Sequence, residues 1–118
     1  MYSPIEPECR FEIERAWAAG FFDGEGTISS QGAKGTKKRY LKIRVAHVDP
    51  RPLRRFAAAV GMGNVTGPLT HRRGNGRWSD FYSWQLAGSR AEEALTRLRP
   101  WLSETRLEQY DRVKEKLS

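Results

Sequence analysis

The sequence is poor in cysteine and in acidic residues, and it lacks any long apolar run. Because Cys9 is the only cysteine, the chain can form neither an internal disulfide nor a zinc cluster built on cysteines, which suits a reducing cytoplasm. No segment has the length and apolarity of a membrane span, and residues 1–10 lack the apolar core of a signal peptide. We therefore expect an intracellular, cytoplasmic protein with no membrane partner.

The shortage of acids leaves the chain strongly basic. Its 118 residues include 21 Lys and Arg against 14 Asp and Glu, which gives a formal net charge of +7. An excess of this size favours a polyanionic partner such as nucleic acid, and it carries no information about the fold. The length corresponds to one domain, residues 1–118, and four Trp, four Tyr and five Phe are too many aromatics for a disordered chain.

Residues 16–22 contain no charged side chain and predict a buried helix that needs cover on nearly all sides. Glycine inside a helix costs about 1 kcal/mol relative to alanine, so we expect another backbone to approach closely where the glycines lie. On a helical wheel one face carries only small residues and one acid, namely Ala16, Ala19, Gly20, Asp23 and Gly24.

Two carboxylates, Asp23 and Glu25, lie at the carboxyl end of this helix. A core helix of a small α/β domain would explain the apolar residues equally well, but it would leave these acids without a use. The helix dipole disfavours negative charge at a carboxyl end, so acids there tend to need a cation, and a metal ion would serve.

The rest of the chain alternates hairpins with helices. We expect an irregular lead-in over residues 1–8, helices over 9–24, 50–60, 89–99 and 103–118, and strands over 27–30, 39–48, 64–72 and 79–87. Asp49 should cap the second helix, Ser89 and Glu92 should form a capping box for the third, and Pro100 should end it. The predicted fold class is α+β, a four-stranded antiparallel sheet whose apolar face is covered by the helices.

The second strand separates an apolar face from a cationic one. Leu41, Ile43 and Val45 alternate with Tyr40, Lys42, Arg44 and Ala46. Solvated sheet faces usually carry cations, but this one has no acid before Asp49, and a twisted sheet fits the DNA major groove. In the fourth strand we assign Tyr82, Trp84 and Leu86 to the core and Ser83 and Gln85 to the groove, an assignment that a bulge would exchange. Candidate DNA contacts on this face and its loops are Thr27, Ser29, Lys34, Lys37, Lys38, Arg39, Tyr40, Lys42, Arg44, Thr70, Arg72, Arg73, Arg77, Ser83 and Gln85.

Residues 18–26, with the sequence AAGFFDGEG, resemble the LAGLIDADG motif of homing endonucleases. The departures are Ala18 for the first leucine, aromatics for the middle aliphatic pair, and Glu25 for aspartate. The resemblance extends over nearly the whole chain, because the expected elements follow the family's αββαββα order, in which the sheet is saddle-shaped. It implies a site-specific double-strand DNA endonuclease, associated with introns or inteins, that cuts a palindromic or nearly palindromic site to leave 3′ overhangs.

The resemblance also implies how one chain becomes an enzyme for two strands. Single-motif members are homodimers that place one acid from each subunit side by side over the minor groove. Here it assigns Glu25 as the metal-binding acid, helped by the carbonyl of Gly24, with Mg²⁺ as cofactor, Mn²⁺ as a substitute, and Ca²⁺ binding without turnover. The implied dimer interface consists of Ala16, Ala19, Gly20, Asp23 and Gly24, where Asp23 caps or pairs and does not bind metal.

The remaining catalytic candidates follow from the same resemblance. Asp49 is explained as an N-cap, and the family also places a water-positioning residue at this junction. Ser103 and Thr105 stand where the family carries a lysine, so Arg106 is the nearest cation, and Arg51 and Arg54 are other candidates to act near the scissile phosphate.

Three alternatives are weighed against this hypothesis. The main rival is a DNA- or RNA-binding module that does not cut, such as a splicing helper or regulator. A stand-alone half of a pseudo-symmetric enzyme, natural or engineered, would have the same sequence features. His71 and Asn75 weakly suggest an HNH-type nuclease, but only two histidines exist and we expect His47 to be packed.

Overall fold

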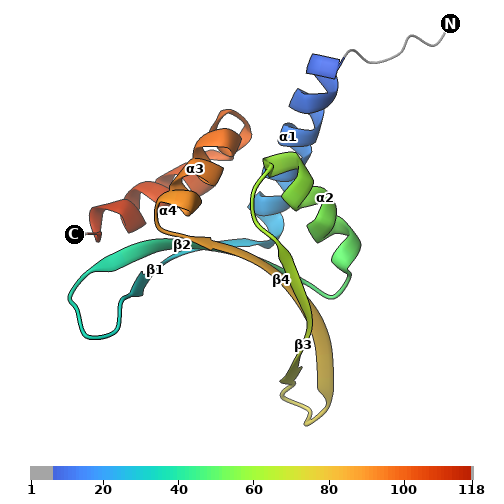
Figure 1. Cartoon of the computed structure of the whole chain (residues 1–118), viewed down its shortest axis with the longest axis vertical. Coiled ribbons are helices and arrows are strands. Elements are labelled where there is room, and N and C mark those ends of the chain that lie inside the picture. The colour runs from blue at the N-terminus through green and yellow to red at the C-terminus, as the bar shows by residue number, and fades with distance from the viewer. Residues whose placement is uncertain (1–6, 118) are drawn as a thin grey trace, which may run out of the picture.

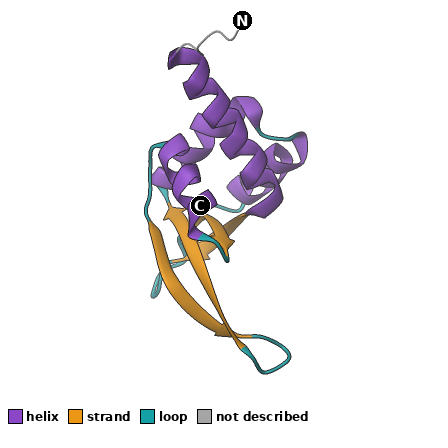
Figure 2. Ribbon diagram, turned by 90° about the vertical axis from the view of Figure 1, so that its right-hand side faces the viewer, coloured by secondary structure: helices purple, strands orange, loops and turns teal. Residues whose placement is uncertain are grey.

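A computed structural model describes residues 7–117 and contains a four-stranded antiparallel sheet with all helices on one face (Figures 1 and 2). The elements follow the predicted order: α1 Pro7–Glu25, β1 Gly26–Gly32, β2 Arg39–His47, α2 Pro50–Val60, β3 Val65–Arg72, β4 Trp78–Ala87, α3 Ser89–Leu98, a short 3-10 turn η1 at Arg99–Trp101, and α4 Glu104–Glu115. The predicted lead-in lies largely outside the described residues, and its last two residues already belong to α1.

The sheet has the order β1-β2-β4-β3, so each hairpin pairs its own two strands and the two hairpins meet where β2 pairs with β4. Figure 1 shows both hairpins curving away from the helices, which makes the opposite face of the sheet concave. The predicted saddle-shaped α+β fold is therefore confirmed. No helix within residues 7–117 has the length and apolarity to span a membrane.

The core lies between the helices and the apolar face of the sheet. Leu41, Ile43 and Val45 of β2 are fully buried or nearly so, as their alternation predicts. On β4, Trp84 packs edge-on against Phe56 of α2 at a ring-centroid distance of 4.7 Å, and its indole N–H donates to the backbone carbonyl of Met62, which follows α2. Trp84 and Leu86 are buried and Tyr82 packs against the core, so the predicted register of β4 is confirmed.

The helix ends follow local chemistry with one exception. The Asp49 side chain accepts a hydrogen bond from the backbone N–H of Arg51, and Gly61 ends α2 in the left-handed region at φ 78°, which glycine adopts without strain. The predicted capping box of α3 is wrong. Gly88, at φ 66°, occupies the cap position, so Ser89 is already helical and its side chain caps nothing. Pro100 lies inside η1, two residues beyond the end of α3.

Candidate nucleic-acid interface and catalytic site

Strand pairing brings the predicted polar residues of the first hairpin onto the concave face. Thr27 and Ser29 of β1 lie opposite Arg44 and Lys42 of β2, and Gln85 of β4 lies opposite Arg44 from the other side. Residues directly opposite each other in an antiparallel sheet share a face, so these five side chains lie away from the helices. Their predicted placement on the cationic face is confirmed.

Arg44 is held in place on this face by two contacts. Its Nε donates to the Ser83 hydroxyl at 3.2 Å, and its guanidinium carbon lies 5.7 Å from the centroid of the Phe81 ring. Ser83 is only 4% exposed, so it supports Arg44 and offers little surface to a base edge. The prediction of Ser83 as a direct DNA contact is corrected accordingly, since its hydroxyl is covered by the arginine.

Two residues of β3 that were predicted to contact DNA, Thr70 and Arg72, face away from the concave face. An irregularity between Thr66 and Leu69 adds one residue to β3 relative to β4. Because side chains alternate along a strand, one extra residue exchanges the two faces beyond it. Thr70 and Arg72 therefore point away from the concave face, and Leu69 and His71 take their places opposite Phe81 and Ser79. The Gly67-Pro68 pair inside a strand was the sequence signal for this bulge.

The hairpin loops carry exposed cations, as predicted. Arg39 is the first residue of β2 and shares the face of Leu41, so it points away from the concave face on which Lys42 and Arg44 lie. Its guanidinium donates to the hydroxyl and the carbonyl of Ser30 at 2.9 and 3.1 Å. At the other tip the backbone N–H of Arg77 donates to the Asn75 side chain at 3.0 Å, which fixes the turn. The remaining predicted loop and strand contacts are exposed, namely Lys34, Lys37, Lys38, Tyr40 and Arg73.

Residues at the start of α4 form hydrogen bonds with the carboxyl end of α1. Arg106 donates through one nitrogen, Nη2, to the backbone carbonyls of Asp23 and Gly26 at 3.0 and 2.5 Å. The Asp23 carboxylate accepts from both the N–H and the hydroxyl of Ser103. Glu25, the last residue of α1, is exposed between these contacts. Asp23 is paired, but with Ser103 of its own chain, and its predicted place at the dimer interface stays a prediction.

Arg106 therefore serves as a cap of α1 in this structure. The last carbonyls of a helix have no helical partners, and a cationic donor there also matches the negative end of the dipole. Sequence reasoning assigned Arg106 a catalytic role from its position alone and missed the contact with Gly26, because the two residues are 80 positions apart in the chain.

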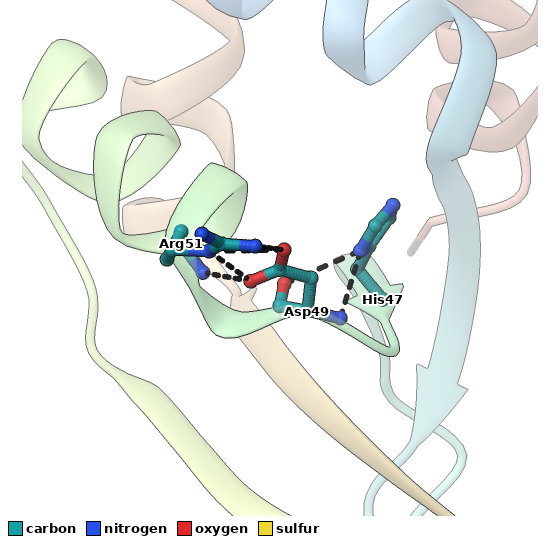
Figure 3. Close-up of polar contacts among 3 residues, drawn as sticks. All are labelled: His47, Asp49 and Arg51. Atoms are coloured by element: carbon teal, nitrogen blue, oxygen red, sulfur yellow. Dashed lines mark hydrogen bonds and ion pairs between the residues drawn. The ribbon is translucent and has the colours of Figure 1, made fainter.

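Asp49 and Arg51 form an ion pair at the start of α2 (Figure 3). The Arg51 guanidinium binds both carboxylate oxygens of Asp49, the shortest contact being 2.6 Å, and its hydrogen bonds lower the pKa of Asp49 to about 2. The backbone N–H of Asp49 donates to Nδ1 of His47, whose ring lies 6.0 Å from that of Phe21. The predictions that Asp49 caps α2 and that His47 is packed are both confirmed.

One side of α1 is uncovered in the single chain. Ala16, Gly20 and Gly24 are exposed, and a Cβ built on either glycine would meet no atom within 4 Å. Ile13, one turn earlier on the same side, is 49% exposed. Ala19 has 0% exposure and belongs to the core of its own chain, so its assignment to a dimer interface is corrected. The expectation that the helix is covered on nearly all sides is not met within one chain.

Among residues 7–117, no three His, Cys, Asp or Glu side chains lie close enough together to hold a metal ion. The oxygen donors at the end of α1 are the Glu25 carboxylate and the Gly24 carbonyl, which lies in the last turn and lacks a helical partner. Both are hard ligands of the kind Mg²⁺ prefers, and Mg²⁺ needs only one or two protein carboxylates.

No protein-family model matches the chain, and no curated protein has a matching sequence. Solved structures that match it include the archaeal intron-encoded homing endonuclease I-Vdi141I complexed with DNA, the LAGLIDADG meganuclease I-CpaMI bound to uncleaved DNA, and the LAGLIDADG homing endonuclease I-GzeII in complex with its DNA target. The TM-scores are 0.57, 0.61 and 0.60, at 11%, 17% and 19% identity over 76%, 86% and 97% of this chain.

These likenesses define the fold as that of LAGLIDADG homing endonucleases, which confirms the predicted fold. The chain spans 56% of the length of the first structure and 36% of the length of the other two.

Proposed function

We propose that the chain is one subunit of a homodimeric, Mg²⁺-dependent, site-specific DNA endonuclease of the intron- or intein-associated kind. It would hydrolyse both strands of a palindromic or nearly palindromic site and leave 3′ overhangs. The observation that carries this proposal is the position of Glu25, an exposed acid at the end of a helix with an uncovered small-residue side, next to a concave cationic sheet. The three solved structures with this fold, each bound to DNA, support the choice of substrate.

The uncovered side of α1 supports the dimer. Ala16, Gly20 and Gly24 present almost no side chain, so a second copy of α1 could approach at backbone distance along them. Such a contact would offset the helix propensity lost at the two glycines. It would also bring two Glu25 carboxylates together, one from each subunit, and two concave faces would then follow one duplex.

Glu25 and the Gly24 carbonyl would hold the metal ion in this proposal. When bound, Mg²⁺ supplies charge stabilisation at the scissile phosphate and lowers the pKa of a bound water. The chain's own groups orient these donors: Arg106 fixes the carbonyls of Asp23 and Gly26 on either side. Lys42 and Arg44 would bind base edges, and the loop cations would bind phosphates.

A selection from randomised duplex DNA tests this proposal. With Mg²⁺, the wild type should cleave a recovered near-palindromic site, whereas Glu25→Gln should bind the same site and cleave it at least a hundredfold more slowly. With Ca²⁺ in place of Mg²⁺, both proteins should bind without cleavage. Glu108→Gln, which changes an exposed acid on α4, is the matched control and should cleave as the wild type does.

A second candidate function is a DNA-binding module that does not cut. It is favoured because both arginines proposed to assist catalysis are engaged within the chain. Arg106 is bound to backbone carbonyls, and Arg51 is paired with Asp49. In the same selection this function gives sequence-selective binding by the wild type with no strand cleavage in Mg²⁺ or Mn²⁺.

A further inference from the structure

The concave face changes character from one hairpin to the other. Around β1 and β2 it is polar and cationic, whereas beyond Arg44 it becomes apolar. Arg44, Ala46, His47, Val48, His71 and Phe81 line an open hollow of about 440 Å³. Leu69, the strand neighbour of Phe81, continues this surface on β3 and is 40% exposed, and Val48 is 62% exposed. We call Ala46, Val48, Leu69 and Phe81 the apolar patch.

The bulge in β3 adds Leu69 to this patch, whereas Ala46, Val48 and Phe81 lie on or beside β2 and β4. Without the extra residue, Thr70 and Arg72 would occupy the concave face in place of Leu69 and His71. Instead Leu69 lies beside Phe81, whose ring also contacts the edge of His71 at a centroid distance of 5.2 Å. Single exposed apolar residues are common on protein surfaces, but the exposed Val48 and Leu69 lie beside the half-buried Ala46 and Phe81 at one hollow, which needs an explanation.

Charge on both sides of the patch indicates what covers it. Arg44 borders the hollow, with its guanidinium directed by Ser83 and lying near the face of Phe81. At the far end of the same hairpin, Arg73 and Arg77 are exposed. A polyanion that binds Arg44 and the hairpin tip together must pass over the apolar patch. The patch is thus continuous with the proposed DNA interface.

We propose that the apolar patch reads thymine through its C5-methyl group in the major groove. The methyl is the one apolar group that the bases present there, and it distinguishes thymine from cytosine by contact with aliphatic or aromatic side chains. Arg44, beside the patch, is suited to a neighbouring guanine. The half-site would then contain thymines under the β3–β4 hairpin next to a guanine under Arg44. This inference rests on the proposed DNA-binding function.

The test replaces thymine by deoxyuridine, which removes only the methyl group. Using the selected target, each thymine is changed singly, and binding to the wild type is measured by fluorescence anisotropy in Ca²⁺. Loss of one buried methyl contact should weaken binding roughly fourfold at the thymines under the patch and leave the other positions unchanged. Replacing the T·A pairs at those positions by C·G pairs should weaken binding further.

Protein variants locate the effect. We call the loss of binding on replacing a thymine by deoxyuridine the uracil effect. Leu69→Ala and Val48→Ala should each weaken binding to the thymine target and abolish the uracil effect at one position. Thr70→Ala is the matched control, because Thr70 is the next residue on β3 but faces away, and it should preserve the full uracil effect. Both patch residues are exposed, so their truncation should not prevent folding, which thermal unfolding of each variant checks.

The outcomes separate this inference from the proposed function. A selected target that binds tightly, with no loss at any uracil, overturns the thymine contact and leaves DNA recognition intact. The thymine contact is likewise overturned if Leu69→Ala and Val48→Ala keep the full uracil effect, and the patch would then serve another partner or none. If no DNA sequence is enriched at all, the proposed function and this inference fail together.

Discussion

At the scale of single residues, Gly26 shows why the helix-to-strand junction needs glycine. Gly26 is buried, and a Cβ built on it would lie 2.6 Å from the Phe22 carbonyl oxygen and closer still to the Phe22 ring. The backbone of Phe22 cannot move away from such a Cβ without disturbing the end of α1. The last residue of the nine that resemble the LAGLIDADG motif is therefore required by the fold, whatever the chemistry at Glu25.

We expect Gly26→Ala to destabilise the protein by roughly 1–3 kcal/mol, as overpacking of a core typically does. The control is Gly32→Ala at the other end of β1, where the new Cβ would meet only the flexible Arg39 guanidinium at 3.6 Å. Chemical denaturation of the two variants measures the difference. Equal stability of the two would show that the junction relaxes and that the glycine is not required.

Arg106 gives a second prediction at this scale. Arg106→Ala removes the donor to the Asp23 and Gly26 carbonyls and should cost roughly 1–3 kcal/mol, the range for lost charge-assisted or buried hydrogen bonds. Arg112→Ala, an exposed arginine on the same helix, should change the free energy of unfolding by less than about 0.5 kcal/mol. Hydrogen exchange should localise the loss to the end of α1, and unchanged protection there would contradict the assigned cap.

At the scale of the element, α2 depends on an acid whose pKa is displaced. The hydrogen bonds from Arg51 lower the pKa of Asp49 from its ordinary value of 3.8 to about 2. A group whose pKa is lower in the folded state stabilises the fold above its ordinary pKa and loses that contribution as the pH falls towards the folded value. The stabilising effect of Asp49 should therefore disappear between pH 3.8 and about 2.

Comparison with Asp49→Asn isolates this effect, because asparagine can cap the helix but does not titrate in this range. Above pH 5 the wild type should unfold at a higher denaturant concentration than the variant, and the difference should vanish as the pH approaches 2. Other acids, such as Glu14 beside Arg55, titrate in both proteins and cancel in the comparison. A constant difference down to pH 2 would contradict the assigned contact.

At the scale of the whole molecule, the proposed dimer predicts that Gly20→Leu separates assembly from folding. A side chain at Gly20 has open space in the single chain, so the monomer should fold as well as the wild type, or better by up to about 1 kcal/mol. The same side chain would block close approach of a second α1. Light scattering should then give the 13.5 kDa monomer for the variant and twice that mass for the wild type.

Ala58→Leu is the control, because Ala58 is exposed on α2 and is not part of the uncovered side of α1. It should remain dimeric. A Gly20→Leu protein that is still a dimer, with DNA or without, would place the interface elsewhere.

Local patterns in the sequence were enough to predict several parts of the structure. The alternation of Leu41, Ile43 and Val45 with cations determined which face of β2 is buried, and Asp49 and Gly61 marked the ends of α2. These features depend on side-chain period and capping within a few residues, which is information that a sequence carries directly.

Only the tertiary structure decided the rest. The bulge in β3 turned Thr70 and Arg72 away from the concave face, Ser83 was covered by Arg44, and Ala19 was buried while its neighbour Gly20 stayed open. Arg106 reached the end of α1 from 80 residues away. Each of these depends on the register between strands or on contact between distant segments, and such geometry is fixed only when the whole chain packs together.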